Sequence, residues 1–167
     1  MESSIVIDKM RDTDWERVRD IYIEGIQTGN ATFETVAPKW EEWDQGHLNE
    51  CRLVVRENGE VIGWGALSPI SRRAAYNGVA EVSIYFSMNS VGKGIGSRLL
   101  KRIIDDSEEN GFWTLQANIF PENAVSIHLH EKHGFEIVGT RKRIGKLNGV
   151  WRDVVLMERR SKIVGMD

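Results

Sequence analysis

Three glycines stand two residues apart near the middle of the chain, at Gly92, Gly94 and Gly96. Glycine allows a positive φ and a close approach of the backbone to a ligand. The turn lies between a strand pattern and a helix pattern, and the free N–H groups at a helix start favour an anion, aided by the helix dipole. The turn therefore predicts a pyrophosphate site, although a tight turn without a ligand has the same sequence.

Two familiar phosphate motifs fit this turn less well. A P-loop needs Ser or Thr after its Gly-Lys pair, whereas Gly94 follows Lys93 here. The dinucleotide fingerprint G-x-G-x-x-G has a longer spacing and usually lies in the first βαβ unit. This turn has a shorter spacing and lies past the middle of the chain, so both motifs are disfavoured.

Glu81 and His130 are side chains that can move a proton. Glu81 lies in an otherwise apolar strand pattern, on the same face as Ser83 and Tyr85. His130 lies in a helical segment. A structural interpretation stands beside each catalytic one: an exposed strand residue or ion pair for Glu81, and a packed, hydrogen-bonded histidine for His130.

The elements that must position these residues follow from hydrophobic periodicity and turn residues. Asn58-Gly59 and Asn148-Gly149 predict two hairpins, and Thr13 with Glu16 predicts a capping box before the first helix. Strands are expected at 5–9, 51–56, 60–67, 79–87, 113–119, 135–146 and 150–157, with helices after residue 13 and around 40–48, 95–110 and 121–133. This order predicts an α+β, three-layer domain with a mixed, largely antiparallel sheet of about seven strands and about four helices.

Bulk composition narrows the function classes. The 167 residues fit one domain spanning 1–167, with a polar tail from about 160 that is expected to fray. A net charge of -3 disfavours nucleic acid as a partner. No apolar run is long enough for a membrane helix, no signal peptide is recognisable, and the single cysteine, Cys51, cannot form an internal disulfide. A cytoplasmic location is therefore expected, and no His/Cys spacing indicates a metal.

Two blocks of sequence resemble the GNAT acyltransferase superfamily. The block from Val91 to Leu100 resembles its pyrophosphate-binding signature of Arg or Gln, two residues, Gly, one residue, then Gly or Ala. The block from Asn123 to Phe135 resembles a later helix that ends in Gly-Phe. Val91 replaces the usual Arg or Gln but still supplies a backbone N–H. The resemblance covers nearly the whole chain and implies a GNAT-like fold, with acetyl-CoA as co-substrate of an N-acetyltransferase.

Within the superfamily, the segments 31–34, 73–85 and 149–153 resemble the phosphinothricin and methionine sulfoximine acetyltransferases. This likeness implies transfer of the acetyl group to the amino group of a small amino-acid-like acceptor, by direct attack on the thioester, in a homodimer. Other acceptors stay open at this point: a polyamine, an aminoglycoside or a protein N-terminus. A non-catalytic acyl-CoA-binding domain is a further alternative, although such a domain would need neither Glu81 nor His130.

The resemblance also implies roles for single residues. Glu81 is the expected base, acting directly or through water, and His130 either protonates the leaving thiolate or assists deprotonation. The acceptor is expected to contact Glu81, Phe33, Tyr76 and Arg73, whose planar donors match a carboxylate as well as those of Arg72 beside it. The expected cofactor-binding residues are Ile84, Tyr85, Phe86, Val91, Gly92, Lys93, Gly94, Ile95, Gly96, Ser97, Asn123 and Ser126.

Overall fold

A computed structural model describes residues 4–90, 92 and 94–167. Over these residues one sheet has the strand order β1-β2-β3-β4-β5-β7-β6, and only the β4–β5 pair is parallel. The strands are β1 (Ile5–Lys9), β2 (Leu53–Glu57), β3 (Glu60–Pro69), β4 (Val79–Phe86), β5 (Thr114–Ile119), β6 (Glu136–Leu147) and β7 (Val150–Arg160). The predicted mixed, largely antiparallel sheet is confirmed, as are both hairpin turns.

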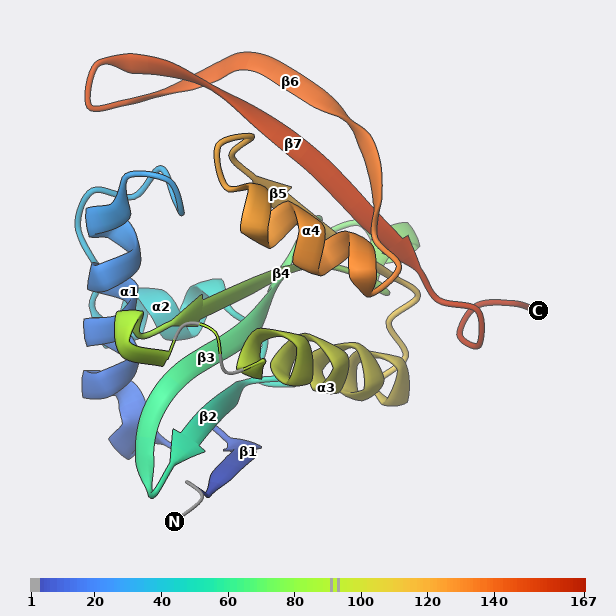
Figure 1. The fold of residues 1–167 in the computed structure, drawn as a ribbon. Helices are drawn as coiled ribbons and strands as arrows, with labels where there is room; N and C mark the ends of the chain where they lie inside the picture. Colours follow the sequence, from blue (N-terminus) through green and yellow to red (C-terminus); the bar gives the residue numbers. More distant parts are fainter. Residues whose placement is uncertain (1–3, 91, 93) are drawn as a thin grey trace.

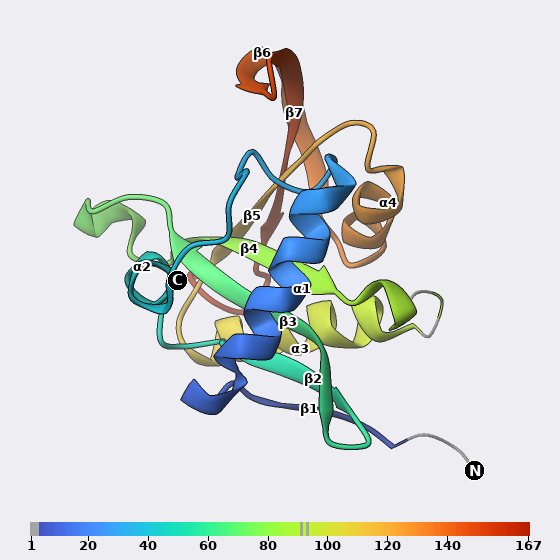
Figure 2. The ribbon, with the colours of Figure 1, turned by 90° about the vertical axis from the view of Figure 1, so that its left-hand side faces the viewer.

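Helices cover the two faces of the sheet and make three layers (Figures 1 and 2). On one face lie α1 (Trp15–Thr28) and α2 (Trp40–Gly46), and on the other lie α3 (Ile95–Glu109) and α4 (Ala124–Lys132). Short 3-10 turns occupy Asp12–Asp14, Ala74–Tyr76 and Met88–Ser90. No helix of the described chain has both the length and the apolar character needed to span a membrane.

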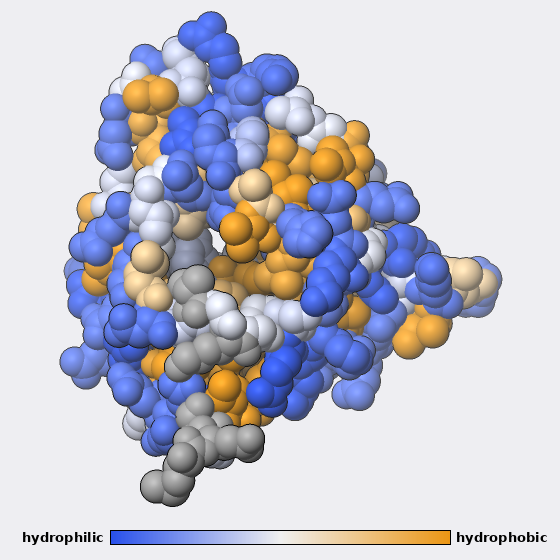
Figure 3. Space-filling model, viewed as in Figure 1, coloured by the Kyte–Doolittle hydropathy of each residue, from blue (hydrophilic) through white to orange (hydrophobic). Residues whose placement is uncertain are grey.

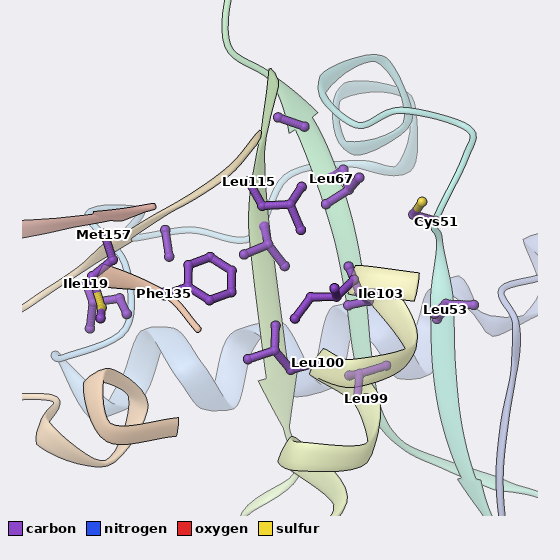
Figure 4. Packing of buried hydrophobic residues seen from close by; sticks show 14 of the residues in the cluster. Cys51, Leu53, Leu67, Leu99, Leu100, Ile103, Leu115, Ile119, Phe135 and Met157 are labelled. Atoms are coloured by element: carbon purple, nitrogen blue, oxygen red, sulfur yellow. The ribbon is translucent and has the colours of Figure 1, made fainter. Parts of the chain in front are cut away.

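The apolar stripe of α3 forms the centre of the main core. Its predicted members Ile95, Leu99, Leu100, Ile103 and Ile104 are all buried. Figure 4 shows the labelled α3 side chains pointing at residues of β2, β3 and β5. Gly65 lets this helix approach β3, because a Cβ there would lie 2.4 Å from Cδ1 of Ile103. The core therefore fixes the start of α3, and with it the Gly-rich turn, against the sheet.

The predicted capping box of Thr13 and Glu16 is wrong. The chain makes a 3-10 turn before α1, and Asp14 accepts a hydrogen bond from the Arg11 N–H at 2.8 Å. Arg56 on β2 also donates to both oxygens of Asp14, at 2.8 and 2.7 Å. This bidentate pair comes from a segment 42 residues away, so a tertiary contact overrides the local pattern.

The sheet opens between β4 and β5. These strands pair only from Val79 to Glu81 on β4, opposite Thr114 to Gln116 on β5. Beyond that point β4 follows β3 as far as Phe86, while β5 follows β7. The backbone of β4 after Glu81 therefore has no β5 partner, and its free edge borders a cleft.

The first residue after β7 is held to the body of the protein. The Ser161 N–H donates to the Trp113 carbonyl at 2.7 Å, and its hydroxyl donates to Glu108 at 2.5 Å. Arg160 donates to the carbonyls of Val164 and Gly165, at 2.8 and 2.7 Å. These bonds oppose fraying at the start of the tail, and the fraying expected from the sequence stays a prediction.

Candidate active site

A cavity of about 80 Å³ occupies the cleft between β4 and β5. In the view of Figure 1 the surface is hollowed between α1 and α4, with hydrophobic atoms beside the hollow (Figure 3). The lining residues come from the loop after α1, both strands, the loop before α4 and α4 itself: Asn30, Ala31, Glu81, Val82, Ser83, Ile84, Tyr85, Ala117, Asn118, Ile119, Phe120, Asn123, Ser126 and His130.

Glu81 lies where this cavity meets a second one of about 210 Å³. Its carboxylate accepts a short hydrogen bond from Nδ2 of Asn118 on β5. The second cavity is also lined by Thr32, Phe33 and Val154. Phe33 packs edge-on against Phe120, with ring centroids 4.9 Å apart. The structure thus brings the predicted base and Phe33 to the same cavity.

His130 is buried, with 2% of its surface exposed, and lines the first cavity. Its Nδ1 lies 2.7 Å from the Ser126 carbonyl oxygen, so Nδ1 carries the proton and Nε2 has the free lone pair. Burial lowers the pKa of His130 and outweighs the hydrogen bond to Ser126, which acts in the opposite direction. The imidazole is therefore neutral near pH 7 and suited to accept a proton.

The Gly-rich turn caps the start of α3 beside a largely apolar cavity. Gly92 and Gly94 have φ of 86° and 70°, and nothing lies within 4 Å of a Cβ built at either one, so the turn is open to a ligand. The cavity is lined by Phe86, Ser90, Gly92, Gly94, Ile95, Gly96, Ser97, Val125, His128, Leu129 and Lys132. An open anion site next to an apolar channel fits a pyrophosphate with an attached pantetheine arm. Val91 and Lys93 lie outside the described residues.

Ser97 and Asn123 have hydrogen-bond partners at the two ends of α4. Ser97 is 2.7 Å from Nε2 of His133, which joins the start of α3 to the end of α4. Asn123 caps α4 by accepting from the Ser126 N–H at 3.3 Å, so its ordinary capping role is present. Asn123 and Ser126 both line the first cavity, so a cofactor contact is compatible with the cap.

Ile84, Tyr85 and Phe86 direct their side chains to opposite sides of β4. The Tyr85 ring stacks on Tyr22 and Trp64, at 5.0 and 4.8 Å, beneath α1. Burial raises the pKa of Tyr85 far above its usual range. Ile84 and Phe86 pack on the α3 side. What these residues present at the free edge of β4 is their backbone, and their contact with the cofactor stays a prediction.

Arg73 and Tyr76 lie away from Glu81. Both are exposed on the loop before β4, where the Arg73 guanidinium lies 5.8 Å from the Tyr76 ring. Tyr76 lines a separate hollow with Trp113 and Gln116. Neither residue lines the two cavities at Glu81, and Arg72 does not line them either. Their contacts with an acceptor stay predictions.

The sequence did not single out Asn118, which lines both cavities at Glu81, or Arg152, which contacts segments that line them. Thr114, Gln116 and Asn118 alternate with apolar residues on β5, which could have indicated a polar face. Arg152 lies in a segment quoted for its resemblance, yet nothing local indicates its partners. Within the described residues no group of three or more His, Cys, Asp or Glu side chains could hold a metal ion.

The diverging strands, the open Gly-rich turn and the apolar channel define an acyltransferase domain. The model of the Acetyltransferase (GNAT) family matches residues 15–135, and the chain belongs to this family. A phosphinothricin N-acetyltransferase of Alcaligenes faecalis is 31% identical over 160 residues, which are 90% of this chain and 79% of that protein. An L-methionine sulfoximine/L-methionine sulfone acetyltransferase of Salmonella typhimurium is 33% identical over 106 residues, 64% of this chain and 62% of its own length.

Solved structures agree with this assignment. The crystal structure of a GNAT superfamily phosphinothricin acetyltransferase from Sinorhizobium meliloti, in complex with AcCoA, is 30% identical with a TM-score of 0.83. The match covers 98% of this chain and 96% of that one. The present protein is therefore an acetyl-CoA-dependent N-acetyltransferase with the GNAT fold, as its sequence predicts.

Proposed function

We propose that this enzyme acetylates the amino group of a small amino-acid-like acceptor of the phosphinothricin, methionine sulfoximine or methionine sulfone kind. The observation that carries the proposal is the place of Glu81 between two cavities, one reaching α4 and the other bounded by Phe33. Relatives named for these acceptors support the acceptor class. The second cavity, about 210 Å³, suits an acceptor of amino-acid size.

Glu81 removes the first proton from the acceptor. A peptide α-amino group has a pKa of roughly 8, and the charged carboxylate of a free amino acid raises it further, so the acceptor amine is largely protonated near pH 7 and cannot attack a carbonyl. The carboxylate takes the proton directly or through water and passes it to solvent. Asn118 fixes one carboxylate oxygen, which leaves the other oriented for this transfer.

The free amine then attacks the thioester directly. Bound acetyl-CoA supplies the activated acetyl group. As the new N–C bond forms, the C–S bond breaks, and the nitrogen must lose a second proton while the departing thiolate gains one. His130 accepts that proton at Nε2 and returns it to sulfur, so all protons balance. A backbone N–H on the free edge of β4 donates to the carbonyl oxygen as its charge grows.

The properties of Cys51 argue against an acyl-enzyme on this cysteine and so favour direct attack of the amine on the thioester. Burial, followed by the nearby Asp106, raises the pKa of its thiol to about 12. The thiolate is the nucleophilic form of cysteine. Cys51 lines neither cavity at Glu81.

A screen of acceptors in a thiol-release assay tests the proposal. We expect methionine sulfoximine, methionine sulfone or phosphinothricin to give the highest kcat/KM, with spermidine and an aminoglycoside as comparison acceptors. A higher kcat/KM for a polyamine would overturn the acceptor class. Acetyl-CoA binding with no turnover of any acceptor would overturn catalysis of this kind. Homodimer assembly and a cytoplasmic location stay predictions, and sedimentation velocity tests the former.

A further inference from the structure

We propose that Arg152 is a positioning residue that fixes the loop of residues 29–34 beside the two cavities at Glu81. The proposal deepens the proposed function and rests on it. Arg152 comes from β7, 123 residues from Gly29, yet its side chain is only 13% exposed. A buried guanidinium with partners on several segments sets their relative positions.

The guanidinium binds the start of the loop directly. Nη1 donates to the Gly29 carbonyl at 2.8 Å, and Nη2 donates to Oδ1 of Asn30 at 2.8 Å. Gly29 ends α1 with a φ of 72°, so its carbonyl belongs to the helix terminus. A cation there also interacts favourably with the negative end of the helix dipole.

The same side chain also binds the segment just before α4, which contributes another wall of the first cavity. Nη2 donates to Oε2 of Glu122 at 3.2 Å, just before α4. Asn123, the cap of α4, donates from Nδ2 to the Asn30 carbonyl at 3.4 Å. Arg152 thus ties the loop after α1 to the segment that begins α4, and both segments line the first cavity.

An aromatic contact extends this link to the second cavity. The Arg152 guanidinium carbon lies 4.1 Å from the centroid of the Phe120 ring, within cation–π range. Phe120 in turn packs edge-on against Phe33. Asn30 and Ala31 line the first cavity, and Thr32 and Phe33 line the second. Moving the loop therefore changes the walls that an acceptor meets near Glu81.

The test compares Arg152→Met with Arg143→Met. Methionine keeps an unbranched apolar side chain but has no donors. Arg143 lies on the same hairpin, and its guanidinium lies 5.6 Å from the exposed Trp151 ring. Steady-state rates are measured with the best acceptor of the screen, whichever class it belongs to, and acetyl-CoA affinity by calorimetry. Hydrogen–deuterium exchange of the backbone amides of residues 29–34 measures the stability of the loop in the absence of an acceptor.

We expect Arg152→Met to raise the KM for the acceptor about tenfold or more, to change the Kd for acetyl-CoA less than threefold and to speed exchange in residues 29–34. Arg152→Lys, which keeps the charge but not the fork, should recover only part of the effect, and Arg143→Met should match wild type. Unchanged exchange in Arg152→Met overturns the proposal, and so does faster exchange with an unchanged acceptor KM. If Arg152→Met does not fold, Arg152→Lys and Glu122→Gln test the proposal instead, by exchange in residues 29–34 and by the KM for the acceptor. The identity of the best acceptor separately decides the proposed function.

Discussion

Glu81 combines two properties expected of a general base: it lines both cavities of the cleft, and Asn118 donates a hydrogen bond to its carboxylate. We predict that Glu81→Gln lowers kcat by roughly 10²–10⁴-fold, the usual contribution of a positioned acid–base group. Because the amide keeps the shape of the side chain, the Kd for acetyl-CoA should stay within about twofold. The measurement is kcat across pH beside calorimetry with acetyl-CoA. A variant rate close to wild type at every pH would remove Glu81 from the mechanism.

His130 leaves a structural and a catalytic interpretation to be separated. In the structural interpretation the Nδ1–H bond to Ser126 fixes a packed ring, and in the catalytic interpretation the Nε2 atom accepts a proton. The amide of His130→Asn can keep a donor near the Nδ1 position but places nothing at Nε2. We predict that this variant lowers kcat by about 10²-fold while its melting temperature falls only slightly. A large loss of melting temperature with an unchanged kcat would assign His130 to packing alone.

At the scale of elements, the open turn before α3 is the proposed site for the pyrophosphate of acetyl-CoA. We predict that Gly94→Ala weakens acetyl-CoA binding roughly tenfold, since a left-handed residue with a Cβ costs about 1–2 kcal/mol and can shift the turn. A Cβ itself would meet nothing within 4 Å, so the effect is conformational. Calorimetry measures the Kd.

The control for this prediction is Gly59→Ala in the β2–β3 turn. Gly59 has a φ of 86° and equally open surroundings, so it carries a comparable backbone strain. It lies in a different turn from the cofactor site. We expect it to lower stability by a similar amount and to leave the Kd unchanged. Equal weakening by both variants would mean that general destabilisation, not the turn, reduces binding.

The elements themselves could be predicted because their signals are local. The Asn58-Gly59 pair indicates a hairpin turn from two adjacent residues. The apolar stripe of α3 indicates its buried face from a pattern that repeats within each turn of the helix. The contacts of Arg152 could not be predicted, since its partners lie 30 to 123 residues away and carry no complementary pattern. The start of α1 was mispredicted for the same reason, because Asp14 accepts hydrogen bonds from Arg56 on β2, which is 42 residues away in the sequence.

At the scale of the whole molecule, the order of the strands decides where polar side chains lie. Glu81 is the last residue of β4 that pairs with β5, so it lies at the point where the two strands diverge, which is a property of the complete strand order rather than of either strand. Arg73 shows the limit of reasoning from one segment: its type suits a carboxylate, but the fold places it on a loop that does not line the Glu81 cavities. A residue's type therefore indicates what it can bind, and the assembled sheet decides whether it can reach the reaction.

The stability of the whole molecule should depend on three partly or fully buried histidines. Burial is the main cause that lowers the pKa of His47, His130 and His133 below the ordinary 6.5. As the pH falls through 6.5, the unfolded chain takes up protons at these positions while the folded protein does not. The folded state therefore binds fewer protons, and the free energy of unfolding falls as the pH decreases.

We predict that this stability is fully present above pH 7 and is lost progressively below about 6.5, by at most about 1.4 kcal/mol per pH unit for each histidine. A second loss should begin near the ordinary carboxyl pKa of 3.8. Burial alone would raise the pKa of Asp14, but hydrogen bonds from Arg56 and the Arg11 N–H outweigh it and lower that pKa. Urea unfolding at pH 7.5, 6.5 and 5.5 measures the first window, and His130→Asn should flatten its slope. A midpoint that is constant from pH 7.5 to 5.5 would show that the folded protein accepts these protons as readily as the unfolded chain.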